Sequence, residues 1–310
     1  MSLDFSVAIP AYNSARFIGE TLEAILGQTH PPAEVIVVDD GSTDDTNAII
    51  RQFGPRVSCI QIQNSGPGAA RKVAIESCNS EWVATCDSDD IWMPDHLSRR
   101  AELIALFPSV TFTFSDCISI GSNATTNYSR VAEAPADWLA NATKQCTTDY
   151  VLFQDAYRAF LKFNPAFPSG WAFRADAYRK IGGINPVYSR RKAEDTEIMR
   201  RFLIHPHAVI AGDLRPTWSY RRHGTNFSEI QWKNILGKAD ILHDQLKSNV
   251  IPKELHDEVL DEIIRTRTEA FNMAFWEGDY RGSLGILPTI PIRNRNLKMY
   301  IRALISKLRS

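Results

Sequence analysis

The first 120 residues alternate between short apolar runs and longer segments with apolar residues at helical spacing. The short runs predict buried strands, and the periodic segments predict amphipathic helices. Repeated strand–helix units predict an α/β fold with a mainly parallel sheet flanked by helices. The predicted strands are residues 6–11, 34–38, 57–62, 82–86 and 110–120, and the predicted helices are 16–27, 43–53, 68–78 and 94–107.

Polar and acidic residues follow three of these strands at the points where they end. Residues 10–12 (PAY), 39–40 (DD) and 87–89 (DSD) occupy these positions. Ligands of such sheets bind beyond the carboxyl ends of the strands. We therefore expect these three segments to meet on one rim and to form a binding site there.

Asp87, Asp89 and Asp90 crowd three carboxylates into four residues. Like charges at this spacing repel one another unless solvent or a cation screens them. Oxygen ligands suit a hard ion such as Mg²⁺ or Mn²⁺, which proteins commonly share with substrate phosphates. A polar turn that caps the next helix is equally compatible with these residues alone. A calcium EF-hand is excluded, because Ile91 and Trp92 replace the residues that its loop requires.

Three further segments carry candidate ligand-binding residues. Residues 39–44 (DDGSTD) form either a turn and helix cap or a site in which Asp40 accepts a hydrogen bond from a nucleobase. Residues 64–71 (NSGPGAAR) form a glycine-rich turn that places Arg71 on the first turn of a helix, where it can pair with a phosphate. His223 follows two arginines in a loop and is a candidate for anion or metal binding.

The composition excludes several classes of function. A net charge of −1 gives no sign of nucleic-acid binding. The five cysteines include no Cys-x-x-Cys pair, which argues against structural zinc and suits a reducing cytosol. The first residues lack the pattern of a secretory signal, and no apolar stretch approaches the length of a membrane span. We therefore expect a cytoplasmic protein, peripheral at the inner face of a membrane if it contacts one.

After residue 121 the strand–helix alternation becomes irregular. Residues 121–148 are rich in small polar side chains, and helices are predicted at 149–162, 176–182 and 195–204, with a strand at 216–221. From about residue 229 the chain is predicted to be helical. The basic segment 293–310 has leucine and isoleucine at helical spacing. It predicts either a helix packed on the core or in a homodimer, or an interfacial helix on anionic lipid.

Seven short motifs, in their order and spacing, resemble those of family 2 glycosyltransferases. The resemblance covers roughly residues 4–228. The motifs are 9–13 (IPAYN), 37–44 (VVDDGSTD), 64–66 (NSG) with 70–71 (AR), 87–90 (DSDD), 170–174 (GWAFR), 182–184 (GGI) and 194–195 (ED).

This resemblance implies the GT-A fold and a set of site residues. It implies a glycosyltransferase domain at 1–228, with a nucleotide-sugar half at 1–120 and an acceptor half at 121–228, followed by a helical region at 229–310. In the nucleotide-sugar half, Pro10, Ala11 and Tyr12 would line the nucleoside pocket. Asp40 would bind the base, and Asp39 would orient the loop. Arg71 would contact the base or the diphosphate, and Asp87 and Ser88 would contact the donor.

The resemblance also implies the residues that would perform the reaction. Asp87 and Asp89 would form the metal-binding Asp-x-Asp, and His223 could close on the diphosphate or metal. Asp195 would be the catalytic base, with Glu194 as its neighbour, and Trp171 would face the acceptor. Because the Gln-x-x-Arg-Trp motif of processive synthases is absent, we expect the enzyme to add a single sugar.

The expected activity is inverting transfer of a hexose from a nucleotide-diphosphate sugar, by default a UDP-sugar, to an acceptor hydroxyl. Mn²⁺ or Mg²⁺ would be the cofactor, and a surface polysaccharide or lipid-linked glycan the acceptor. Two alternatives stay open at this stage. A nucleotidyltransferase would bring a similar set of nucleotide-binding and metal-binding side chains together. It should also carry a glycine-rich basic loop after the first strand, which this sequence lacks there. An inactive nucleotide-sugar binding protein is the other.

Overall fold

The computed structural model of this 310-residue chain describes residues 3–121, 129–140, 143–145, 147–224 and 229–310. These residues divide into two compact units. We call Met1–Arg190 with Ile198–His223 the sheet unit, and Arg191–Glu197 with Gly224–Ser310 the helical unit. The predicted domain boundaries after residues 120 and 228 stay predictions.

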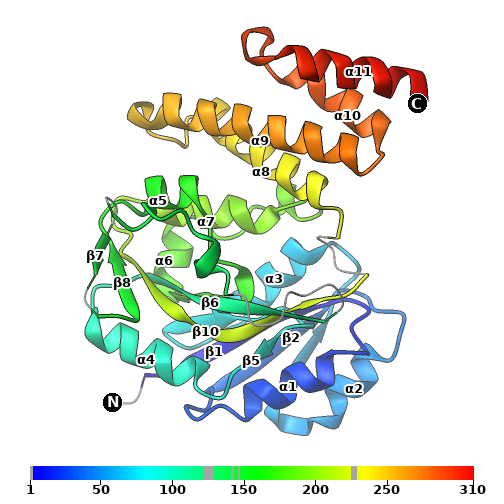
Figure 1. Cartoon of the computed structure of the whole chain (residues 1–310). Coiled ribbons are helices and arrows are strands. Elements are labelled where there is room, and N and C mark those ends of the chain that lie inside the picture. Colours follow the sequence, from blue (N-terminus) through cyan, green and yellow to red (C-terminus); the bar gives the residue numbers. More distant parts are fainter. Residues whose placement is uncertain (1–2, 122–128, 141–142, 146, 225–228) are drawn as a thin grey trace. The chain divides into compact units, whose positions relative to one another are not determined.

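The sheet unit is built on one sheet in the order β3-β2-β1-β4-β9-β6-β10-β8-β7, with β5 paired to β10 (Figure 1). The first four strands in this order run parallel, and so do β6 and β10, whereas β9 runs antiparallel to both of its neighbours. The strands are β1 Phe5–Ala11, β2 Glu34–Asp39, β3 Ser58–Gln61, β4 Trp82–Thr85, β5 Ile91–Trp92, β6 Phe112–Gly121, β7 Thr143–Gln145, β8 Tyr150–Phe153, β9 Ala172–Arg174 and β10 Ile210–Arg222.

Helices cover the two faces of this sheet. Helices α1, α2 and α4 lie on one face, and α3, α5 and α6 lie on the other (Figure 1). Strand β1 is buried along its whole length, which explains why its sequence is apolar rather than alternating. The helices are α1 Ile18–Leu26, α2 Thr46–Gln52, α3 Pro67–Glu76, α4 His96–Leu106, α5 Ala156–Lys162, α6 Ala175–Lys180 and α7 Glu194–Ile204, whose first turn belongs to the helical unit.

The predicted α/β fold with a mainly parallel sheet is confirmed, and three local predictions need correction. The helix expected at 149–162 begins as β8, because Tyr150–Phe153 pairs antiparallel with β10 before α5 starts. The strand expected at 216–221 extends from Ile210 to Arg222 and contains register shifts around Pro216, which has no N–H to donate. Strands β5 and β9 were not predicted, because each spans no more than three residues and is too short to show an alternation of apolar and polar side chains.

The helical unit contains α8 Gln231–Lys247, α9 His256–Trp276, α10 Tyr280–Ile286 and α11 Leu297–Arg309. Its core includes Trp232 of α8, Phe271 of α9, Ile286 of α10 and Met299 of α11. The predicted helical C-terminal extension is therefore confirmed. Among the described residues, none of the helices combines the length and the apolar character that crossing a bilayer requires.

Candidate functional site

The three polar segments predicted to share a rim do lie together in the sheet unit. Strand β1 is hydrogen-bonded in parallel to both β2 and β4, so the three strands end on the same side of the sheet. Ala11 is paired with Asp39 in register, and the Asp40 N–H donates to the Ala11 carbonyl at 2.8 Å. The residues after β1, β2 and β4 thus form one continuous edge.

Side-chain hydrogen bonds tie the loop after β1 to the loop after β2. The Asn13 N–H donates to Ser42 Oγ at 2.9 Å, and the Thr43 N–H donates to Asn13 Oδ1 at 2.9 Å. Asn13 has a φ of 48°, a backbone conformation that asparagine tolerates better than most residues. These bonds fix the loop and leave the Tyr12 ring half-exposed at the rim, where a planar ligand can stack on it.

Asp39 and Asp40 are both buried, and both orient backbone. Asp40 accepts the N–H of Ser65 at 2.7 Å on Oδ1 and the N–H of Gly66 at 2.8 Å on Oδ2. Asp39 Oδ1 accepts the Ser42 N–H at 3.0 Å. The loop-orienting role expected of Asp39 is therefore seen in the contacts of both aspartates, and base recognition by Asp40 stays a prediction.

Arg71 lies on α3 and reaches the acidic loop. Its guanidinium Nη2 donates to Asp87 Oδ1 at 2.9 Å, and the arginine is almost fully buried. Helix α3 starts after Gly66, whose φ of 96° suits glycine. Ser189 supports this start, because its Oγ accepts the Ala69 N–H at 2.7 Å. The buried positive charge of Arg71 is thus held beside the loop predicted to bind a diphosphate.

The three carboxylates of the acidic loop have different surroundings. Asp90 is buried, and it accepts from Ser169 Oγ at 2.5 Å and from the Arg221 N–H at 2.9 Å. Burial, together with Asp89 and Asp87, raises the pKa of Asp90 well above its ordinary value. Asp90 therefore anchors the loop, while Asp87 and Asp89 are left at the rim.

His223 completes this group from a distant part of the sequence. Its Nε2 lies 2.9 Å from Asp89 Oδ2. Burial and the charge of Asp87 raise the pKa of Asp89, and the hydrogen bond with His223 acts in the opposite direction. His223 directly follows β10, so the order of the strands brings it to the acidic loop.

Phe17 and Arg221 hold His223 in place. The rings of Phe17 and His223 stack, with centroids 4.5 Å apart. Arg221 donates from Nε to the Asp89 carbonyl at 2.9 Å and from Nη2 to Glu20 at 2.5 Å, and its guanidinium lies over the Phe17 ring. Sequence analysis missed Phe17, since an aromatic residue at the start of a helix carries no signal of this role.

Ser169 is another residue that sequence analysis missed. Its Oγ accepts the Asp87 N–H at 3.0 Å while donating to Asp90, and its carbonyl accepts from Trp92 Nε1 at 2.7 Å. The predicted donor contact Ser88 is buried, with its Oγ 2.6 Å from Ser14 Oγ, so its contact with a donor stays a prediction. The only sequence signal for Ser169 is its position directly before the motif at 170–174.

The prediction that Trp171 faces the acceptor needs correction. Its side chain is 1% exposed, and its ring lies 5.7 Å from that of Phe112 in the core. The Trp171 carbonyl accepts the Thr85 N–H at 3.1 Å at the end of β4. Trp171 therefore supports the strand that leads into the acidic loop, and its indole is not available to an acceptor.

Glu194 and Asp195 open α7 and belong to the helical unit. Asp195 Oδ1 accepts the Thr196 N–H at 2.9 Å, and both carboxylates are partly exposed. Acidic side chains in the first turn of a helix complement its dipole, and this alone would account for them. The catalytic role of Asp195 and the neighbouring role of Glu194 stay predictions.

The side chains at the rim fit a divalent cation that is shared with a ligand. No cluster of three His, Cys, Asp or Glu side chains suited to a metal ion occurs in the described parts of the chain. Asp89 and His223 nevertheless bring a carboxylate and an imidazole together, with Asp87 nearby. Mg²⁺ is commonly held by one or two carboxylates together with substrate phosphates, and imidazole is also a ligand of transition metals.

Known proteins resemble this chain in sequence and in fold. Residues 6–135 match the family model described as glycosyl transferase family 2. A Bacillus subtilis protein named as a teichuronic acid biosynthesis glycosyltransferase, TuaG, is 35% identical over 153 residues, which cover 47% of this chain and 56% of TuaG. This chain thus spans little more than half of that relative.

Two solved structures show a similar fold at low sequence identity. S. aureus TarS 1-349, solved in complex with UDP-GlcNAc, has a TM-score of 0.65 at 21% identity, covering 94% of this chain and 83% of that one. The mannosyltransferase PcManGT from Pyrobaculum calidifontis, solved with GDP-Man and Mn²⁺, has a TM-score of 0.58 at 16% identity, covering 99% and 87%. Residues 6–135 of this chain therefore match the family 2 glycosyltransferase model, and the fold is GT-A.

Proposed function

We propose that this protein transfers one sugar from a nucleotide-diphosphate sugar to an acceptor hydroxyl, with inversion at the anomeric carbon. The observation that carries the proposal is the meeting of Asp89 and His223, at 2.9 Å, on the rim that also holds the Arg71–Asp87 pair. A carboxylate pair, an imidazole and an arginine at the ends of parallel strands suit a diphosphate and its cation. The family match supports the same class of reaction.

The donor nucleotide would lie along the edge formed by the ends of β1 and β2. Tyr12 would stack on the base, with Pro10 and Ala11 forming the pocket floor, because Tyr12 is exposed and the other two residues are buried. Asp40 would accept from the base edge through lone pairs that its backbone contacts leave unused. Uridine is the proposed nucleoside, as in the UDP-GlcNAc bound to TarS.

The diphosphate would lie against the acidic loop and the start of α3. Arg71 would contact it from its fixed position beside Asp87. Asp89 and His223 would hold Mn²⁺ or Mg²⁺, which when bound supplies positive charge to the departing diphosphate. Phe17 and Arg221 orient His223, so that this imidazole needs little rearrangement when the donor binds.

The acceptor hydroxyl needs a base, because a neutral hydroxyl is a weak nucleophile. We assign this role to Asp195, which would remove the proton as the hydroxyl attacks the anomeric carbon, with Glu194 as its neighbour. One base and one displacement give inversion. The acceptor would be a surface polysaccharide or a lipid-linked glycan at the cytoplasmic side of a membrane, in keeping with the name of TuaG.

A donor-consumption assay tests the proposal. Purified protein is incubated with a panel of nucleotide sugars, Mn²⁺ and cell-envelope acceptors, and the released nucleotide is identified. Release of a nucleoside diphosphate is expected, whereas release of pyrophosphate in a parallel incubation with a nucleoside triphosphate and a sugar 1-phosphate would assign a nucleotidyltransferase. Asp195→Asn should abolish transfer, whereas Glu194→Gln should retain part of it. Transfer by Asp195→Asn at the wild-type rate would refute the assignment of the base.

A further inference from the structure

Helix α11 exposes most of its large aliphatic side chains instead of burying them. Leu297, Ile301, Leu304 and Leu308 are 75%, 50%, 61% and 80% exposed. Their spacing places them on one side of the helix, since each residue advances the helix by about 100°. We call these four side chains the outward stripe. It belongs to the helical unit and contains none of the residues of the candidate site.

The opposite side of α11 packs on the helical unit. Met299 and Ser306 are buried, and Ser306 Oγ lies 2.9 Å from Ser283 Oγ of α10. Met299 belongs to the same core as Phe271 and Ile286. An amphipathic helix of a globular protein normally buries its apolar side. The face of α11 that packs on the helical unit includes Ser306, which pairs with Ser283. The outward stripe, which has more apolar side chains, therefore faces away from that core.

Positive charge accompanies the stripe. Residues 280–310 contain seven Lys or Arg residues and no Asp or Glu. By helical spacing Lys298, Arg302 and Arg309 follow one edge of the stripe, and Lys307 lies on the other. Hydrophobic side chains bordered by lysine and arginine are typical of helices that lie in a membrane interface.

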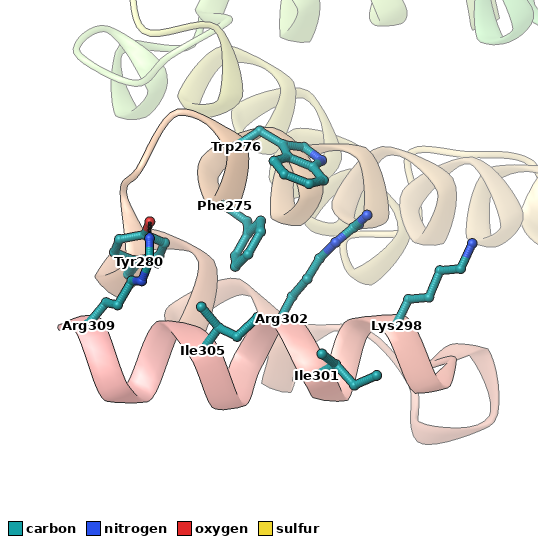
Figure 2. Close-up of a pocket in the computed structure, with 8 residues that line it drawn as sticks. All are labelled: Phe275, Trp276, Tyr280, Lys298, Ile301, Arg302, Ile305 and Arg309. Carbon is teal, nitrogen blue, oxygen red and sulfur yellow. Dashed lines mark hydrogen bonds between the residues drawn. The ribbon is translucent and has the colours of Figure 1, made fainter.

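A pocket of about 440 Å³ borders the basic edge, and aromatic residues line its far side (Figure 2). The Arg302 guanidinium lies 5.1 Å from the Trp276 ring, and Arg309 donates to the Tyr280 hydroxyl at 2.9 Å. Trp276 is 71% exposed. Tryptophan and tyrosine beside lysine and arginine are the side chains that anchor proteins at the headgroup level of a bilayer.

We propose that the outward stripe and its basic border dock this protein on the surface of an anionic membrane. The leucines would enter the boundary between headgroups and acyl chains, and the cations would pair with lipid phosphates. Charge favours this occupant over a second copy, because two such basic segments would repel each other. The proposal does not rest on the proposed sugar transfer.

Vesicle co-sedimentation of the full chain tests this proposal. Phosphatidylcholine vesicles with and without phosphatidylglycerol are compared at low and high salt. The wild type should bind the anionic vesicles, and this binding should weaken at high salt, because salt screens the attraction between the cationic side chains and the lipid phosphates. Leu304→Asp should weaken binding on the order of tenfold, because it replaces a membrane-buried leucine by a charge. Lys307→Ala should weaken it about fivefold.

Leu260→Asp is the matched control, since Leu260 is exposed on α9 of the same unit but lies outside the stripe. It should bind like the wild type, and all variants should show wild-type circular dichroism. Wild type that fails to bind anionic vesicles would overturn the proposal. So would a wild-type dimer that Leu304→Asp converts to a monomer without any vesicle binding, because the stripe would then belong to a second copy.

Discussion

Replacing Asp40 by asparagine should destabilise the sheet unit, although the side chain keeps its size. Asp40 accepts the backbone N–H groups of Ser65 and Gly66 at 2.7 Å and 2.8 Å, one on each carboxylate oxygen. Asparagine offers one acceptor oxygen and one NH₂ group. One of the two backbone donors would therefore face another donor instead of an oxygen.

The expected loss follows from these contacts. A hydrogen bond to a charged group contributes about 1.5–3 kcal/mol, and a buried donor left without a partner costs a similar amount. Asp40→Asn should therefore lower the free energy of unfolding by about 2 kcal/mol. For a protein unit of this size that corresponds to a fall in Tm of about 4–8 °C.

Asp45→Asn provides the control, because it removes the same charge a few residues away. Asp45 is exposed and makes no side-chain cap hydrogen bond at the start of α2. Its replacement should change stability by less than about 0.5 kcal/mol. Urea unfolding of both variants, followed by circular dichroism and tryptophan fluorescence, gives the comparison. An Asp40→Asn variant as stable as Asp45→Asn would refute the inferred role in holding the 64–66 turn.

Three further predictions concern residues of the sheet unit. Gly66→Ala should lower the free energy of unfolding, measured in urea, by at least about 1 kcal/mol. The reason is that Gly66 has a φ of 96° and the new Cβ would lie 2.8 Å from the Ser189 carbonyl oxygen. Wild-type stability of this variant would contradict the prediction. Burial lowers the pKa of His96 well below its ordinary value. Below a pH of about 6.5 only the unfolded chain takes up the proton, so the free energy of unfolding should fall by up to about 1.4 kcal/mol for each pH unit. His96→Gln should remove that slope, and an unchanged slope would contradict the cause. Phe17→Ala should weaken metal-dependent donor binding up to about tenfold through loss of the stack on His223, and Phe17→Tyr should restore it.

The sequence allowed the first half of the sheet unit to be predicted well. Apolar runs and helical periodicity placed β1 to β4 and α1 to α4 within a few residues, because each is a local pattern that short loops connect. The same logic placed Tyr12, Asp40 and Asp89 on one rim, since parallel strands end on the same side. These predictions needed no information on long-range contacts.

Other features depended on pairings between distant segments. Strand β9 lies between β4 and β6 although it follows them by many residues, and β8 was mistaken for the start of a helix. Trp171 was expected to face the acceptor, and its side chain is in the core. His223 was a candidate only through its neighbouring arginines, and its contact with Asp89 depends on the strand order that β10 completes.

The site itself was only partly predictable for a similar reason. Three aspartates within four residues look equivalent in the sequence, yet Asp90 is turned inward by Ser169 and Arg221. Nothing in the local sequence marks Ser169 or Phe17 as partners of this loop. Which acidic side chain faces a ligand is therefore decided by tertiary contacts, whereas the presence of an acidic rim is decided by the local sequence.

The central claim is that Asp89 and His223 hold a cation shared with the donor diphosphate. Titration calorimetry of nucleoside diphosphate binding tests this claim. The account predicts that UDP binds in the presence of Mn²⁺, that EDTA abolishes this binding, and that Asp89→Asn weakens it by at least about tenfold, or about 1.4 kcal/mol. Wild-type affinity of Asp89→Asn in Mn²⁺, or undiminished UDP binding in EDTA, would contradict it.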